Sequence, residues 1–220
     1  MNEHSGDFFD IHHELAEAKA GERLSCVGLD IKDLKDRGSV VDLGAKDCWI
    51  ERAARQHGID NVVSVDINFP EEVTRMGLNQ RIMDAKHLEF VDSSINLVIS
   101  RAGPIFIEKK EAEALEILRE MNRVVSPEPH GEIRIHPARF GFIQQRLFSE
   151  HSEYFDAAYR PGLGVNPLEA RILIQYNLLA NRMSMDYLEK SGFNFEIGMV
   201  DNLPQLSEDL QTFFVLKKRV

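Results

Sequence analysis

The residues most able to bind a ligand lie in the segment SVVDLGAKDCWIERAARQHG, at positions 39–58. The pattern is that of a buried strand followed by a loop and a helix, an arrangement that commonly holds a nucleotide. Glycine lets such a loop bring its backbone close to the ligand, because glycine has no side chain and adopts left-handed conformations. Here the loop reads GAKDC from Gly44 onwards, with a single glycine. The segment predicts a nucleotide-binding loop in which other residues have replaced some glycines.

Further polar side chains lie at the ends of other apolar runs. Asp66 ends VVSVD, Asp84 ends QRIMD, Arg101 follows INLVIS and His136 ends GEIRIH. A carboxylate accepts hydrogen bonds, a guanidinium binds carboxylate or phosphate, and an imidazole can act as a base. If the runs are strands of one parallel sheet, these side chains meet at its carboxyl edge, where α/β proteins bind their ligands.

The apolar runs alternate with helical stretches from residue 39 onwards, which predicts a parallel sheet with right-handed crossovers and helices on both faces. The linker between the last two runs is too short for a helical crossover, so we expect the last strand to run antiparallel. The predicted fold class is α/β, a three-layer Rossmann-like fold with a seven-stranded, mostly parallel sheet and a reversed last strand. The strands are expected at residues 40–43, 61–67, 80–85, 95–100, 131–137, 193–200 and 212–218.

Helices are expected at residues 47–56, from Pro70 to about Gly77, and at residues 108–125. The last of these has the clearest amphipathic pattern. Its predicted buried stripe consists of Ala112, Leu115, Leu118 and Met121 or Asn122.

Two segments of different character divide the chain. Residues 1–38 are expected to form helices, broken near Gly21 and Gly28, that pack on the edge of the domain. Residues 39–220 are expected to form the domain itself, with a helical insertion around residues 140–190.

The composition narrows the class of partner. The chain has 220 residues, 43% of them hydrophobic, and a net charge of −10. This charge repels phosphate backbones, so nucleic acid is not expected as a partner.

No apolar run approaches the roughly 20 residues of a membrane helix, and the N-terminus lacks a secretory pattern, so we expect a cytoplasmic protein without a membrane span. The two cysteines form no CxxC pair, which suits a reducing compartment, and the pair His12-His13 does not have metal-ligand spacing.

Four segments, in this order, resemble the class I (Rossmann-like) S-adenosylmethionine-dependent methyltransferases, from residue 40 to the C-terminus. VVDLGAKDC is similar to the first-strand motif of that family, an acid followed by alternating glycines. VVSVDI is similar to its second strand, whose terminal acid holds the cofactor ribose. RIMDAKHLEFVDSSINLVIS looks like the segment in which an aspartate binds the adenine edge. LREMNRVVSPEPHGEIRI looks like the passage from a helix into the following strand.

The sequence departs from the family pattern at several positions. Lys46 and Cys48 stand where the family has its second and third glycines. The sequence PEPHG replaces a Pro-Gly-Gly turn, and Asn96 stands where an acid often opens the fourth strand. The loop resembles a degenerate form of the family's glycine loop.

The resemblance implies S-adenosylmethionine as the cofactor and assigns residues to its ribose and adenine. Asp66, followed by Ile67, would accept hydrogen bonds from the ribose diol, and the alternative is that Asp66 caps the helix after Pro70. Asp84 would accept a hydrogen bond from the adenine amino group, and the amide of Ala85 or of the next residue would donate to the ring. The alternative is that Asp84 is an ordinary loop acid.

The methionine end of the cofactor would lie against Gly44, with Ser100 also assigned to the cofactor site. Asp42 would organise the loop or reach the cofactor ammonium through water, or it would only brace the loop. We hypothesise that Lys46 swings outward and places its ammonium near the cofactor carboxylate. The alternative is that Lys46 fills the pocket, paired with Asp42 or Asp47.

Methyl transfer demands alignment and desolvation of the acceptor, and for a hydroxyl or amine also removal of a proton. Arg101 and His136 are the candidate catalytic residues, as a clamp for a substrate anion and as a base. Tyr154, Phe155 and Tyr159 would form a lid, a core cluster or part of a substrate pocket. The predicted function is S-adenosylmethionine-dependent methyl transfer to a small molecule or a protein. The alternative is an inactive methyltransferase-like domain that serves binding or assembly.

Overall fold

The computed structural model describes residues 5–127, 129–138, 140–150, 167–199 and 212–218. They contain a seven-stranded sheet with the strand order β3-β2-β1-β4-β5-β7-β6. Strands β1 to β5 run parallel, and β7 pairs antiparallel with both β5 and β6. The predicted α/β fold with a reversed last strand is therefore confirmed. The strands are β1 (Val40–Leu43), β2 (Val62–Asp66), β3 (Gln80–Ile82), β4 (Leu97–Arg101), β5 (Glu132–His136), β6 (Phe195–Met199) and β7 (Thr212–Leu216).

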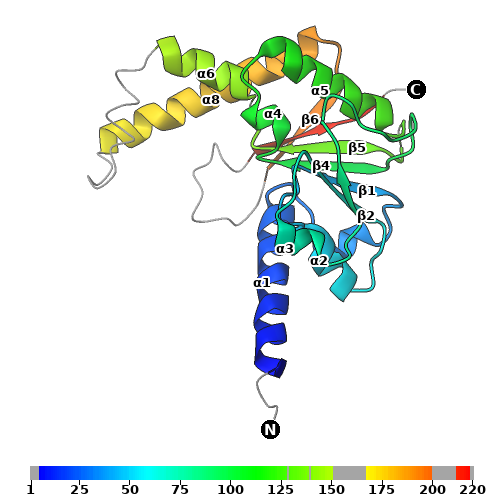
Figure 1. Cartoon of the computed structure of the whole chain (residues 1–220). Coiled ribbons are helices and arrows are strands. Elements are labelled where there is room, and N and C mark those ends of the chain that lie inside the picture. The colour runs from blue at the N-terminus through cyan, green and yellow to red at the C-terminus, as the bar shows by residue number, and fades with distance from the viewer. Residues whose placement is uncertain (1–4, 128, 139, 151–166, 200–211, 219–220) are drawn as a thin grey trace.

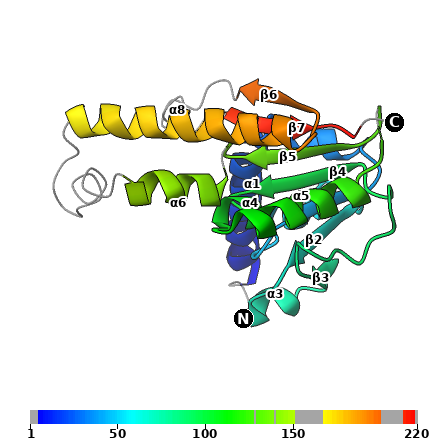
Figure 2. The same ribbon diagram turned by 90° about the horizontal axis from the view of Figure 1, so that it is seen from above.

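Helices cover both faces of the sheet and give the domain three layers (Figures 1 and 2). On one face, α4 (Pro104–Ile107), α5 (Glu111–Val124), α6 (Gly141–Glu150) and α8 (Pro167–Lys190) share a core with Val41 and Val98. On the other face, α1 (Ser5–Ser25), η1 (Ile31–Leu34) and α2 (Trp49–Gln56) share a core with Val40 and Leu97. The short α3 (Glu71–Thr74) follows β2. None of the helices in the described ranges is long and apolar enough to cross a membrane.

Side chains alternate between the two faces along each strand, and this places two charged residues on the α1 face. Val40 of β1 packs on that face, so Asp42, two residues further on, points the same way. Its Oδ1 lies 3.7 Å from Nη2 of Arg23 on α1. Arg101 at the end of β4 pairs with Glu22 of α1 at 2.9 Å. The last turns of α1 therefore lie against the carboxyl ends of β1 and β4.

Most predicted elements differ from the structure by a few residues at their ends, and two predictions fail by more than that. Helix α1 continues through Gly21 without a break. Its neighbours Ala20 and Leu24 are buried, and this packing outweighs the roughly 0.5–1 kcal/mol that an interior glycine costs. Strand β3 ends at Ile82 instead of residue 85, because the chain turns back on itself between Asp84 and His87.

The buried side of α5 is rotated from the predicted stripe. Leu118 and Met121 are buried as predicted, whereas Ala112 is exposed and Leu115 only partly buried. The helix instead buries Ala114, Ile117, Leu118, Met121 and Val124.

Some predictions concern residues outside the described ranges. The aromatic residues Tyr154, Phe155 and Tyr159 lie there, as does the linker between the last two strands. The division into a segment 1–38 and a domain 39–220 with an insertion stays a prediction.

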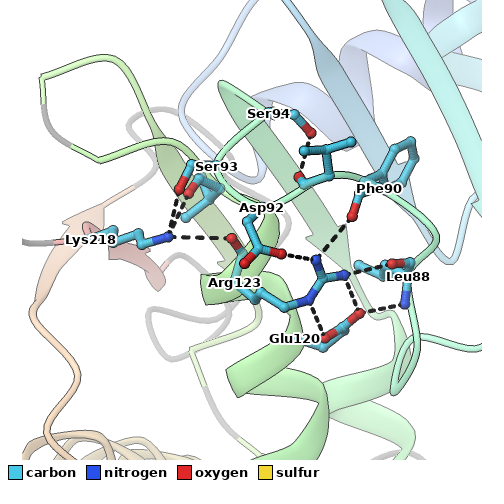
Figure 3. A network of polar contacts seen from close by, with 10 residues as sticks. Leu88, Phe90, Asp92, Ser93, Ser94, Glu120, Arg123 and Lys218 are labelled. Carbon is cyan, nitrogen blue, oxygen red and sulfur yellow. Dashed lines mark hydrogen bonds and ion pairs between the residues drawn. The ribbon is translucent and has the colours of Figure 1, made fainter.

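Arg123, near the end of α5, fixes the loop between β3 and β4 (Figure 3). Its guanidinium donates to the carbonyl oxygens of Leu88 at 2.7 Å and Phe90 at 3.0 Å. It also pairs with Glu120 at 2.6 Å and with Asp92. Glu120 in turn accepts a hydrogen bond of 2.7 Å from the Leu88 N–H. One side chain therefore anchors the segment that leads from the ligand edge back into the sheet.

Replacing Arg123 by lysine should lower the free energy of unfolding by about 2 kcal/mol, because an ammonium cannot make the forked contacts of a guanidinium. Urea denaturation measures this change. The matched control is Arg119→Lys, since Arg119 is exposed on the same helix, and it should change stability by less than about 0.5 kcal/mol. Equal effects of the two substitutions would contradict the anchoring role of Arg123.

Candidate functional site

A pocket of about 490 Å³ lies at the carboxyl ends of β1, β2 and β4. The strand order reverses between β1 and β4, so the pocket is at the topological switch point, where open α/β sheets bind ligands. Its walls are the loops that follow β1, β2, β3 and β4, together with parts of α4 and α5. The predicted cofactor residues that line it are Gly44, Lys46, Asp66, Ile67, Asp84 and Ala85.

The loop after β1 keeps the backbone conformations of a glycine loop. Gly44 has φ 81°, Lys46 has φ 41° and Cys48 has φ 54°, all in the left-handed region. Lys46 and Cys48 are the two positions at which the family pattern has glycine. A residue with a Cβ atom is strained there by roughly 1–2 kcal/mol, so the surrounding structure must hold it. Lys46 and Cys48 therefore adopt conformations that favour glycine although both carry side chains.

Lys46 has its side chain exposed at the rim of the pocket. In the described part of the chain, no carboxylate lies within ion-pair distance of its ammonium. The alternative that Lys46 pairs with Asp42 or Asp47 and closes the pocket is therefore wrong.

Asp66 ties the loop after β1 to the end of β2. Its Oδ2 accepts a hydrogen bond of 2.9 Å from the Lys46 N–H, and its Oδ1 accepts one of 3.3 Å from the Asn68 N–H. Helix α3 starts at Pro70 without a side-chain cap, so the alternative role of Asp66 as a helix cap is wrong. Because a carboxylate accepts up to about four hydrogen bonds, both oxygens can still accept one from a ligand.

Asp84 and Lys86 form the wall of the pocket after β3. Asp84 Oδ1 accepts a hydrogen bond of 2.9 Å from the Lys86 N–H, which closes a tight turn. The Lys86 ammonium pairs with Glu113 of α5 at 2.8 Å. Hydrogen bonds from Lys110 and Lys86 hold the pKa of Glu113 at about 2, so this carboxylate stays ionised. The Asp84 carboxylate remains exposed as an acceptor beside the pocket.

Gly103 brings the loop after β4 against the end of β1. A Cβ atom on Gly103 would lie 2.8 Å from the Leu43 carbonyl oxygen and 2.6 Å from Ser100 Oγ. A Cβ atom on Gly44 would lie 3.1 Å from the Gly103 Cα. A Cβ atom on Gly103 would collide with the Leu43 carbonyl oxygen, and one on Gly44 would make the Gly103 backbone shift slightly, so the two loops pack closely against each other.

Asp42 is buried behind Gly44, with no exposed surface. Burial raises the pKa of its carboxyl above the ordinary value, and the nearby Arg23 guanidinium lowers it in part. Arg23 Nη2 donates to the Gly44 carbonyl oxygen at 3.2 Å. Among the described residues, none donates a hydrogen bond to either Asp42 oxygen. Asp42 is therefore a buried carboxylate with unused acceptor capacity.

The remaining predicted residues do not line the pocket. Arg101 is held by Glu22 on the α1 face, and Ser100 is buried beneath Gly103. His136 is 6% exposed, and its carbonyl oxygen accepts a hydrogen bond of 2.7 Å from the Ala102 N–H. The catalytic roles of Arg101 and His136 stay predictions.

The Cys48 thiol follows the loop after β1 and does not line the pocket. Burial raises the pKa of the Cys48 thiol to about 11, so it stays protonated and is a poor nucleophile. Within the described ranges, no three His, Cys, Asp or Glu side chains gather closely enough to hold a metal ion.

Sequence reasoning missed Arg23 and the segment after β4, from which Pro104, Ile107 and Glu108 reach the pocket. The Gly-Pro dipeptide directly after the fourth strand marks a loop at the ligand edge and could have indicated this segment. No sequence signal indicated Arg23, because it lies on a helix that precedes the first strand.

Comparison with solved structures gives the class of fold. A candidate S-adenosylmethionine-dependent methyltransferase from Methanococcus maripaludis matches 97% of this chain and 92% of its own, with 13% identity and a TM-score of 0.52. A methyltransferase from Methanosarcina mazei matches 87% of this chain and 99% of its own, with 16% identity and a TM-score of 0.51.

The 1,6-didemethyltoxoflavin-N1-methyltransferase of Burkholderia thailandensis was solved with its substrate and S-adenosylhomocysteine. It matches 97% of this chain and 83% of its own, with 15% identity and a TM-score of 0.50. No family model matches the sequence, and no curated protein sequence matches it either. The chain has the fold of the class I S-adenosylmethionine-dependent methyltransferases.

Lys46→Gly should raise the free energy of unfolding by about 0.5 kcal/mol. The relief of roughly 1–2 kcal/mol of left-handed strain exceeds the roughly 0.5–1 kcal/mol that glycine costs in chain entropy. Urea denaturation measures the change. Lys46→Ala is the matched control, because it removes the same ammonium and keeps the Cβ atom. A glycine variant less stable than the alanine variant would contradict the strained conformation of Lys46.

Asp42→Asn should stabilise the protein at neutral pH. The folded-state pKa of Asp42 is raised above its ordinary value of 3.8, so ionisation of Asp42 destabilises the fold as the pH rises through that raised pKa. The asparagine variant avoids this loss, and its advantage should shrink as the pH falls towards 3.8. Urea denaturation at several pH values tests this. Asp60→Asn, at an exposed position, is the control, and a similar pH trend in both variants would count against the assignment.

Proposed function

We propose that the chain is an S-adenosylmethionine-dependent methyltransferase that acts on a small molecule or a protein. The observation that carries the proposal is the loop after β1, where three left-handed residues place backbone beside the Asp66 carboxylate. Left-handed conformations at Lys46 and Cys48 cost free energy, and backbone strain of this kind is concentrated at ligand-binding sites.

The chemistry of the pocket fits the parts of this cofactor. Asp66 retains acceptor capacity for a ribose diol, and Asp84 is exposed as an acceptor for an adenine amino group. Ile67 is 72% exposed and lines the pocket, so it offers an apolar surface on which a purine ring can pack. Gly44 presents bare backbone to the methionine end, as predicted from the loop sequence.

The cofactor, when bound, supplies a methyl group that its sulfonium has already activated. The residues of this chain then have to hold the two reactants in line and exclude water. The pocket extends from Gly44 to Ile107 and Glu108, in the segment after β4. We place the acceptor on this side of the pocket, beside Ile107 and Glu108.

Calorimetric titration with S-adenosylhomocysteine tests the proposal. The wild type should bind it, and Asp66→Asn should weaken binding by about 1.5–3 kcal/mol, the range for hydrogen bonds to a charged group. Asparagine keeps the shape of the side chain and an oxygen for the Lys46 N–H. Asp60→Asn, at an exposed position two residues before β2, is the control and should leave affinity unchanged.

Absence of binding by the wild type would refute the proposal. Binding without any conversion of S-adenosylmethionine to S-adenosylhomocysteine across small-molecule and protein acceptors would support the alternative, an inactive binding or assembly domain.

A further inference from the structure

Strand β6 lies at one end of the sheet, and in the described part of the chain it pairs with β7 alone. The Lys217 N–H donates to the Asn194 carbonyl oxygen at 3.0 Å, directly before β6 begins. In an antiparallel pair, the backbone groups of every second residue point towards the partner strand, so those of Glu196 and Gly198 also face β7. The residues whose backbone N–H and C=O groups point out of the sheet are Phe195, Ile197 and Met199.

The two end strands of the sheet differ in how well they are protected. An open edge can pair with another chain, and proteins usually protect it with basic side chains, proline or a short strand. Strand β3, at the other end, has three residues with the exposed Arg81 at its centre. Strand β6 has five residues, without proline or a basic residue. Its one charged side chain, Glu196, is paired with Lys217 at 2.8 Å. The edge of β6 is therefore open to a further strand.

One face of β6 carries a row of apolar side chains. Phe195 packs against the core that α8 shares with the sheet. Because side chains alternate between the faces of a strand, Ile197 and Met199 project from the same face as Phe195. Ile197 is 49% exposed and Met199 is 65% exposed. The row therefore continues from the core into solvent at the open edge.

Helix α8 extends this apolar surface. The Asn181 side chain of α8 donates to Thr212 Oγ1 at 3.2 Å, and Thr212 lies opposite Met199 in the sheet. The two leucines before Asn181, Leu178 and Leu179, are exposed. Figure 2 shows β6 and α8 on the side of the molecule opposite β3. An exposed apolar surface beside an open strand edge is typical of a contact with another protein chain.

The sequence of β6 is compatible with a second copy of itself in one register. A twofold axis at Glu196 would place two carboxylates directly opposite each other, which is unfavourable. An axis at Gly198 would leave Phe195 opposite a residue beyond the strand. An axis at Ile197 places Glu196 opposite Gly198 of the second copy. Phe195 then lies opposite Met199 of the second copy, and the outward backbone groups of the two strands meet.

We propose that β6 pairs antiparallel with β6 of a second copy of this chain, around a twofold axis at Ile197. The two sheets then form one continuous sheet. The axis is perpendicular to the sheet, so α8 lies on the same face in both copies and its exposed leucines add apolar contact. A contact that uses the same surface on both copies closes on itself and gives a dimer. The inference is independent of the proposed function, because none of the described residues that line the pocket belongs to β6 or α8.

Sedimentation velocity of the full chain at increasing micromolar concentrations tests the dimer. Ile197→Lys should raise the dimer dissociation constant by at least about 10-fold, because it places two ammonium groups opposite each other at the axis. Ile82→Lys is the matched control, since Ile82 is an exposed isoleucine of the other end strand, β3. This control should leave the dissociation constant within about twofold. Circular dichroism checks that both variants are folded.

A cysteine cross-link tests the register separately. Both native cysteines, Cys26 and Cys48, are buried. In the proposed register, Ile197→Cys places two thiols on directly opposed residues whose Cα atoms are roughly 5.5 Å apart. Met199→Cys is the matched control, because its two thiols are separated by roughly 13 Å along the strands. A thiol-specific cross-linker with a one-carbon spacer should therefore join two chains of Ile197→Cys and not of Met199→Cys.

A wild type that sediments as a monomer at every concentration would refute the inference. A dimer that Ile197→Lys leaves intact, or that Ile82→Lys weakens equally, would show that the contact lies elsewhere. Equal cross-linking of the two cysteine variants would contradict the register. Assemblies larger than a dimer would contradict a contact that closes on itself.

Discussion

The left-handed path of the backbone from Gly44 to Cys48 is the constraint on which the ligand edge depends. The N–H groups of Gly44 and Ala45 donate to the Val65 carbonyl oxygen at 2.8 and 3.1 Å, and this joins β1 to β2 beyond the ends of the strands. The next residue, Lys46, then donates to Asp66. A right-handed or extended conformation at Gly44 or Lys46 would turn these N–H groups elsewhere and separate the loop from β2.

The same backbone path explains why glycine is present at position 44, whereas positions 46 and 48 carry side chains. Gly44 packs against the backbone of Gly103, so a Cβ atom there would make the Gly103 loop shift. At Lys46 the side chain leaves towards solvent, and at Cys48 it enters a small apolar cluster with Phe69 and Val73. Left-handed strain at these two positions is a cost that the hydrogen bonds of the loop can offset. At Gly44 a side chain would add a tight contact with the Gly103 backbone to this strain.

The sequence correctly indicated a seven-stranded, mostly parallel sheet with a reversed β7, and the structure brings the strand-end acids Asp66 and Asp84 to one pocket. These features follow from short-range signals. Alternation of apolar runs with helices specifies a parallel sheet, and an acid at the end of a strand lies at the ligand edge by topology. The break expected at Gly21 and the stripe expected from Ala112 were wrong because packing against α2 and the sheet outweighed the local signal.

The sequence by itself determined the three-layer α/β fold and the group of residues at the carboxyl ends of β1, β2 and β3, because hydrophobic period and motif order are local properties of the chain. Only the tertiary structure decided what surrounds Asp42. Nothing local relates Arg23 to Asp42 or Glu22 to Arg101, since the members of the two pairs are 19 and 79 residues apart. Their contact arises because α1 packs on α2 and so lays its last turns across β1 and β4. The packing of α1 on α2, which no sequence motif signals, therefore placed the positive charge of Arg23 beside the glycine loop.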